Sequence, residues 1–281
     1  MQPRGTDSGR RRAGPADGRG TIGGVDPAPL HVEEFGPVDG QVVLALHGVT
    51  GHAGRWRVLA AALPDVRLVA VDLRGHGRSP WAPPWHLEQH VADALAVLDR
   101  LGLDRVVVAG HSFGGAIAVH LARTAPERVH RLILLDPAIG LDPQDMLETA
   151  EESRADDSYP DLAAARADRV RRWEGVDDAL VDAELAEHLV PDGDRLRYRY
   201  SQASVIAAWG EMARPAVLPP AGIRTLVLPA AKADLVDPAW LDAWRAESGA
   251  ALTVAEVDAG HMLYLERTAE VAGHVAAFLR G

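Results

Sequence analysis

Short apolar runs alternate with longer amphipathic stretches along most of the chain. The stretch 87–101 places Val91, Leu95 and Leu98 on one stripe at helical spacing, and Gly102 follows as a stop signal. The apolar runs are continuous in Val, Leu and Ile, which is typical of strands covered on both faces. This rhythm predicts a mostly parallel sheet flanked by helices. The expected strands are 30–35, antiparallel to the others, 42–46, 67–71, 105–109, 132–135, 225–228 and 252–257, and the expected helices are 56–63, 87–101, 114–124 and 269–279.

One segment, 140–215, breaks this rhythm. It is acidic and rich in alanine, it contains no convincing strand, and it has helical patterns at 162–173, 179–188 and 201–212. We interpret it as a helical cap over the strand ends. The sequence therefore predicts a disordered tail at 1–24, a core made of 25–139 and 216–281, and a cap at 140–215.

Composition and charge narrow the possible functions. The chain has 281 residues, of which 47% are hydrophobic and 25% charged, as is ordinary for a globular enzyme. It has no cysteine, which excludes disulfides, thiolate metal sites and cysteine nucleophiles. The net charge of −11 argues against nucleic acid and membranes as partners. No apolar run follows the N-terminal arginines, so we expect no secretory signal and a cytoplasmic protein.

The strongest chemical signal is a serine between a strand and a helix. Residues 110–114 read Gly-His-Ser-Phe-Gly and follow the expected strand 105–109. Such a turn pushes its central side chain out of the sheet edge, and small residues are needed on either side because the turn leaves no room for larger ones. The sequence therefore predicts Ser112 as a nucleophile, with the following helix N-terminus beside it.

Two further motifs precede this turn in an order that resembles the α/β-hydrolase fold family. Residues 44–49 read Leu-Ala-Leu-His-Gly-Val, and 71–79 read Val-Asp-Leu-Arg-Gly-His-Gly-Arg-Ser. The resemblance extends from Leu30 to the C-terminus. It implies an α/β fold with a mostly parallel central sheet, flanking helices and a helical cap inserted after the sixth strand. It also implies that the backbone amides of Val49 and Phe113 form the oxyanion hole.

The same resemblance implies the base and the acid of a catalytic triad. His261 follows the last expected strand within Asp-Ala-Gly-His-Met, where family members place the general base. Asp234 follows the strand 225–228 and fits the place of the acid, although Ala231 stands where the family usually has glycine. Two alternatives remain open. Asp237 is the acid if the loop is shifted, and Asp136, after the strand 132–135, is where some relatives keep theirs.

Other histidines and tryptophans have weaker claims to a role. His86 and His90 stand four apart, but the intervening residues lack the glutamate position of a zinc protease, so we expect two solvent-facing histidines and no metal. Trp173 and Trp209 lie in the expected cap, where they line an apolar pocket or pack the cap on the core. His111 is expected to be a structural residue of the turn.

These residues predict a serine hydrolase that cleaves a small-molecule carboxylic ester or lactone through an acyl-enzyme intermediate. We expect it to use no metal and no organic cofactor. An acyltransferase, a cofactor-free perhydrolase or a carbon–carbon bond hydrolase on the same triad is the alternative enzyme reading. A non-catalytic small-molecule receptor is the alternative without chemistry, and the three filled triad positions argue against it.

Overall fold

Seven strands form one sheet in the computed structural model, which describes residues 26–281. The strand order is β1-β3-β2-β4-β5-β8-β9, and β1 is antiparallel to its neighbour while the other pairs are parallel. This arrangement confirms the expected sheet and its antiparallel first strand. The strands are β1 (Val32–Phe35), β2 (Gln41–Leu46), β3 (Val66–Val71), β4 (Val106–His111), β5 (Val129–Leu135), β8 (Arg224–Leu228) and β9 (Leu252–Val254).

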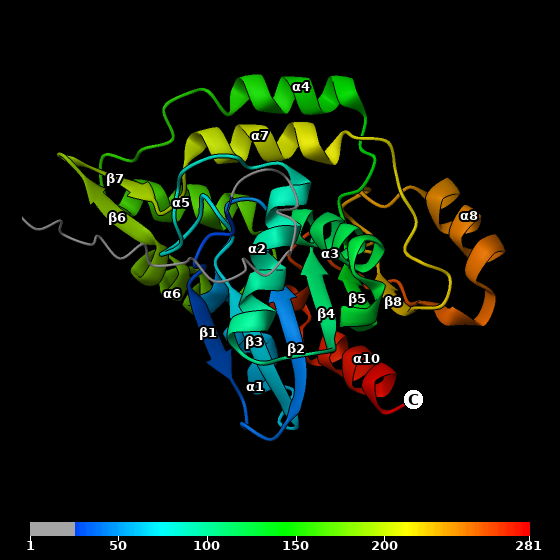
Figure 1. The fold of residues 1–281 in the computed structure, drawn as a ribbon. Coiled ribbons are helices and arrows are strands. Elements are labelled where there is room, and N and C mark those ends of the chain that lie inside the picture. Colours follow the sequence, from blue (N-terminus) through cyan, green and yellow to red (C-terminus); the bar gives the residue numbers. More distant parts are fainter. Residues whose placement is uncertain (1–25) are drawn as a thin grey trace, which may run out of the picture.

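Helices cover both faces of the sheet, which explains the continuous apolar runs of its inner strands. On one face lie α2 (Leu87–Arg100), α3 (Phe113–Thr124) and α8 (Pro238–Ser248), which share one buried apolar cluster. On the other face, α1 (Arg57–Ala61), α9 (Leu263–Glu266) and α10 (Thr268–Arg280) share a second cluster. Figure 1 shows the sheet between these two layers. Short 3₁₀ turns at Ala53–Trp56, Pro126–Arg128 and Gly249–Ala251 complete the core.

The amphipathic pattern of α2 is confirmed, but one of its histidines was misjudged. His86 caps the helix, and its ring accepts a hydrogen bond from the Gln89 amide at 3.2 Å. His90, one turn later, is buried and meets the Phe113 ring edge-on at a centroid distance of 5.4 Å. The expectation that both histidines face solvent is therefore wrong for His90, which lies on the side of α2 that packs against α3.

The insertion between β5 and β8 contains four helices and a hairpin (Figure 1). The three expected helices are present, but the expectation of no strand is wrong. A tight turn at Gly193, whose φ is 63°, joins two short strands, and this Gly-Asp loop is the usual signal of a two-residue hairpin. The elements are α4 (Pro143–Glu152), α5 (Leu162–Arg172), α6 (Asp178–His188), β6 (Leu189–Asp192), β7 (Arg195–Tyr198) and α7 (Gln202–Met212).

This insertion lies at one end of the sheet. It follows β5, the fifth strand along the described chain rather than the sixth, and it lies beyond the carboxyl ends of the parallel strands. None of the helices in residues 26–281 has the length and apolar character needed to cross a bilayer. The predicted disordered tail, 1–24, lies outside the described residues.

Candidate active site

Ser112 lies at the turn between β4 and α3 in a strained backbone conformation. Its φ of 54° and ψ of −122° are rarely adopted by residues other than glycine. The turn is closed tightly, because a Cβ added at Gly110 would stand 2.2 Å from the carbonyl oxygen of Gly114. Paired strands surround it, with His111 of β4 opposite Leu135 of β5, and the Ser112 amide donates to the Leu135 carbonyl at 3.2 Å. The expected serine turn is therefore present at the carboxyl edge of the sheet.

His261 lies in the loop after β9 and is oriented by Asp136. Its Nδ1 stands 2.6 Å from Asp136 Oδ2. Since a carboxylate accepts, Nδ1 donates to it, and in the neutral ring this tautomer leaves the lone pair on Nε2. Asp136 is fully buried, and its other oxygen accepts from the Ala230 amide at 3.0 Å. Its φ of 42° is again in the left-handed region, at the residue directly after β5.

This pairing differs from the expected one, in which Asp234 is the acid. Asp234, the predicted partner, is exposed and has no hydrogen bond or ion pair with any residue of the described chain. Asp237, the second alternative, caps α8 by accepting from the Ala239 amide at 2.8 Å. The physical reason lies in the loop lengths. Asp136 follows its strand immediately, whereas Asp234 stands six positions after Leu228 and is carried outward by the intervening turn.

The predicted oxyanion loop lies against Ser112. A Cβ added at Gly48 would stand 2.8 Å from the Ser112 Cβ and 3.3 Å from its Oγ, so only glycine fits beside the hydroxyl. His47 fixes this loop from behind, because its Nε2 accepts from the Leu73 amide at 2.9 Å and its Nδ1 donates to the Gly48 carbonyl at 2.7 Å. Burial, with a smaller effect from His76, lowers the pKa of His47 well below its usual value.

The two expected oxyanion donors differ in how they are held. Phe113 is the first residue of α3, so its amide has no carbonyl one turn earlier in the helix to bond with. Val49 follows Gly48, which lies against Ser112 and whose carbonyl also accepts from the Gly51 amide at 3.0 Å. That these two amides form the oxyanion hole stays a prediction.

A cluster that the sequence did not predict connects the loop around Gly48 with the cap. It consists of His52, Arg55 and Glu184, and we call it the cap junction. Glu184, on α6, accepts from Arg55 Nη2 at 2.5 Å and lies 2.8 Å from His52 Nε2. Arg55 also donates to the Thr50 carbonyl at 2.8 Å, one residue after Val49. Burial alone raises the pKa of Glu184, but Arg55 and His52 outweigh it and hold the pKa well below the usual range.

His111 is a second positioning residue that sequence reasoning left as merely structural. Its Nε2 lies 2.8 Å from the backbone carbonyl of His261, so Nε2 donates and ties the His261 loop to the serine turn. The two imidazole rings have centroids 4.5 Å apart. Burial, followed by the neighbouring His261, lowers the pKa of His111 well below its usual value, which keeps this buried ring neutral.

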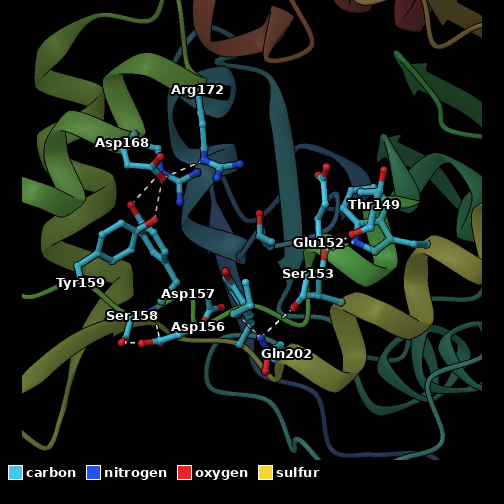
Figure 2. Close-up of a pocket in the computed structure, with 17 residues that line it drawn as sticks. Thr149, Glu152, Ser153, Asp156, Asp157, Ser158, Tyr159, Asp168, Arg172 and Gln202 are labelled. Atoms are coloured by element: carbon cyan, nitrogen blue, oxygen red, sulfur yellow. Dashed lines mark hydrogen bonds and ion pairs between the residues drawn. The ribbon is translucent and has the colours of Figure 1, made fainter. Parts of the chain in front are cut away.

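A cavity of about 530 Å³ lies within the insertion, and Thr50 is its one lining residue from the core among residues 26–281. Thr50 connects it with the oxyanion loop, while Ser112 and His261 are not among its lining residues. Figure 2 shows Arg172, Asp168 and Tyr159 on one side and Glu152, Ser153 and Gln202 on the other. Trp209 also lines it, whereas the second tryptophan considered, Trp173, is buried between cap and core. Most residues that line this cavity are polar, unlike the expected apolar pocket, although apolar atoms supply about half of its surface.

Known proteins resemble this chain over nearly its whole length. A family model for the alpha/beta hydrolase fold matches residues 41–268. Lipase LipV of Mycobacterium tuberculosis is 42% identical over 255 residues, which cover 89% of this chain and 97% of that protein. The dihydrolipoyllysine-residue acetyltransferase component of the acetoin cleaving system of Pseudomonas putida is 29% identical over 95% of this chain and 70% of its own length.

Solved structures agree with this result at the level of the fold. The crystal structure of E-2-(acetamidomethylene)succinate hydrolase superposes with a TM-score of 0.78 at 22% identity, over 90% of this chain and 95% of that one. The chain therefore belongs to the α/β-hydrolase fold family. Its similarity to LipV groups it with hydrolases of the lipase and esterase type.

Proposed function

We propose that this protein is a serine hydrolase that cleaves a small-molecule carboxylic ester or lactone, with Ser112 as nucleophile, His261 as base and Asp136 as the orienting acid. The observation that carries the proposal is the 2.6 Å contact between His261 Nδ1 and the buried Asp136 carboxylate, at the same sheet edge as the strained Ser112 turn. The family assignment supports hydrolysis as the reaction class.

Acylation begins with the proton of the serine hydroxyl. His261 Nε2 takes this proton as Ser112 Oγ bonds to the ester carbonyl carbon, and the carbonyl oxygen becomes an oxyanion. The amides of Val49 and Phe113 donate to that oxygen, and losing one such donor typically costs about 3–4 kcal/mol of barrier. The tetrahedral adduct then expels the alcohol oxygen, which receives the proton from His261. The products of this half-reaction are the acyl-enzyme and a free alcohol.

Deacylation repeats these steps with water. His261 Nε2 removes a proton from water as its oxygen bonds to the acyl carbon, and the oxyanion forms again at the same two amides. Collapse breaks the bond to Ser112 Oγ, which takes the proton back from His261. Throughout, Asp136 stays ionised, holds Nδ1–H and stabilises the imidazolium. For a lactone, the released alcohol and acid are two ends of one product.

Covalent labelling combined with ester turnover tests this proposal. A fluorophosphonate probe should modify the wild-type protein once, and mass spectrometry of the digested protein should place the adduct on Ser112. Ser112→Ala should lose the adduct and reduce hydrolysis of short p-nitrophenyl esters by on the order of 10⁶-fold. Ser248→Ala, at the end of α8, serves as the control and should keep both.

The same experiment separates hydrolysis from its alternatives. Release of acid and alcohol in equal amounts indicates hydrolysis, whereas an acyl group recovered on an added alcohol or peroxide indicates acyl transfer. A protein that is folded but neither labelled nor active on esters or lactones would contradict the proposal and favour a receptor.

A further inference from the structure

We propose that the cap cavity binds a carboxylate carried by the ester substrate, and that Arg169 is the residue that recognises it. The inference rests on the proposed function, because it assigns a substrate class to the same site. It starts from a buried cation that the catalytic steps do not use. Arg169 lies on α5, lines the cavity and is 6% exposed.

The guanidinium of Arg169 is held by aromatic groups. Its Nε donates to the Tyr198 hydroxyl at 2.9 Å. Its central carbon stands 4.2 Å from the centroid of the Tyr198 ring and 4.8 Å from that of the Trp173 ring. No carboxylate of residues 26–281 lies within ion-pair distance of it. The side chain is therefore rigid and aromatic-packed, yet its charge is not neutralised by an anion.

The carboxylates that line the cavity are mostly engaged elsewhere. Asp168 accepts from the Tyr159 hydroxyl at 2.7 Å and from Arg172 at 2.8 Å, and it also pairs with Arg171. Two further lining carboxylates form ion pairs with arginines of β7. Asp157 pairs with Arg197 at 3.4 Å, and Asp156 pairs with Arg195 at 3.7 Å. Arg197 also pairs with Asp192 at 3.6 Å, and Glu152 lies at the exposed end of α4.

Arg169 is therefore a buried cation at the cavity wall that no ion pair within residues 26–281 compensates. A buried charge is costly unless it is paired, and a planar guanidinium matches a carboxylate through two parallel hydrogen bonds. Tyr200, which is 8% exposed and also lines the cavity, uses its hydroxyl to bond Asp157. The net charge of −11 opposes anions at long range, but this effect is screened beyond about 8 Å at physiological salt, whereas the contact with Arg169 is local.

The cavity comes nearest to the proposed reaction centre along the chain at Thr50, which the cap junction holds. Arg55 donates to the Thr50 carbonyl at 2.8 Å, and its guanidinium carbon stands 5.0 Å from the same Trp173 ring that Arg169 covers. Thr50 both lines the cavity and follows the proposed oxyanion donor Val49. An ester whose carbonyl lies at Ser112 can therefore extend past Thr50 and place a carboxylate at Arg169.

Matched esters test this assignment. One pair carries the charge on the acyl side: mono-p-nitrophenyl glutarate and its neutral methyl ester. The other carries it on the alcohol side: the butyrate ester of 3-hydroxybenzoic acid and that of methyl 3-hydroxybenzoate. We expect wild type at pH 8 to prefer the acid in at least one pair by about tenfold in kcat/KM, chiefly through KM, a preference equal to about 1.4 kcal/mol.

Variants on one helix then identify the residue. Arg169→Gln should reduce that preference to about one, and Arg169→Lys, which keeps charge but loses the planar fork, should retain part of it. Arg166→Gln, on the same helix but paired with Asp178 and Asp182 away from the cavity, is the matched control and should keep the full preference. Thermal unfolding of each variant checks that the fold is intact.

The outcomes separate this inference from the proposed function. Equal turnover of acid and neutral ester by wild type in both pairs would overturn the inference while leaving ester hydrolysis in place. A preference that survives in Arg169→Gln would do the same. No turnover of any of the four esters by wild type would instead contradict the proposed function.

Discussion

The sheet edge and the cap cavity are built from different kinds of interaction. At the sheet edge, Ser112 and Asp136 are buried, directly follow neighbouring strands, and bond to backbone amides and carbonyls. In the cavity, Asp168 and Arg172 form an ion pair between their side chains, and the Arg172 side chain is 64% exposed. Strand ends fix geometry to a fraction of an ångström, whereas surface ion pairs rearrange easily. The comparison suggests that the core fixes the chemistry and that the cap selects the substrate.

The sharpest way to break this comparison is to replace the acid at the sheet edge. Asp136→Asn should lower kcat/KM for a neutral ester by about 10⁴-fold, because an amide no longer holds the His261 tautomer with Nδ1 protonated. Asp234→Asn, at the exposed residue that the sequence favoured, should stay within about twofold of wild type. Steady-state kinetics with p-nitrophenyl butyrate measures both.

Folding is the control for this pair, since Asp136 also accepts from the Ala230 amide. Circular dichroism and fluorophosphonate labelling of Asp136→Asn should show a folded protein with slow labelling at Ser112. If Asp234→Asn shows the large loss and Asp136→Asn does not, the acid is the one predicted from the sequence, and the hydrogen bond of His261 is not the catalytic one.

The sequence predicted the serine turn, whose geometry depends only on the residues at the end of a single strand. The serine turn needs glycine at 110 and 114 because its backbone leaves no room, and that requirement is visible as a motif. The acid could not be chosen in the same way. Strands β5 and β8 are parallel neighbours, so Asp136 and Asp234 both follow strands that end at one edge. Only the path of the loop after β8 decides which of the two meets His261, and no sequence motif predicts that path.

The helices of the cap were predicted from the sequence, but the buried charged residues on them were not. The buried Glu184 reads in the sequence as one more acid of an exposed helix, because its partners Arg55 and His52 lie about 130 positions earlier. Hydrophobic spacing identifies the buried stripe of a helix only when apolar residues form it. Arg169, surrounded by other arginines near the end of α5, was hidden for the same reason.

A second prediction sharpens the comparison at the cap junction. Glu184→Ala should lower the free energy of unfolding by about 3–5 kcal/mol, because it leaves the buried Arg55 without its counter-ion. Glu187→Ala, on the same helix, breaks a pair with Arg57, whose side chain is 53% exposed, and should cost less than about 1 kcal/mol. Urea denaturation followed by tryptophan fluorescence measures both. Equal losses in the two variants would show that the junction is no stronger than a surface ion pair.

The smallest predicted effect concerns how the core responds to acid. Burial lowers the pKa of His90 to about 3, so in the folded protein this ring stays neutral where an unfolded chain, with a pKa of about 6.5, takes up a proton. The stability that it contributes is therefore fully present above pH 6.5 and is lost as pH falls toward the folded pKa, at about 1.4 kcal/mol per pH unit.

Removing this histidine should flatten the pH dependence without removing it. His90→Asn should reduce the slope of unfolding free energy between pH 6.5 and 5 by about 1.1 kcal/mol per unit on average, whatever its effect on stability at pH 7.5. Part of the slope should remain, because burial also lowers the pKa of His76, to about 4. His274→Asn, on the partly exposed side of α10, is the matched control. Urea midpoints at four pH values measure the slopes, and an unchanged slope in His90→Asn would mean that this ring binds its proton equally in both states.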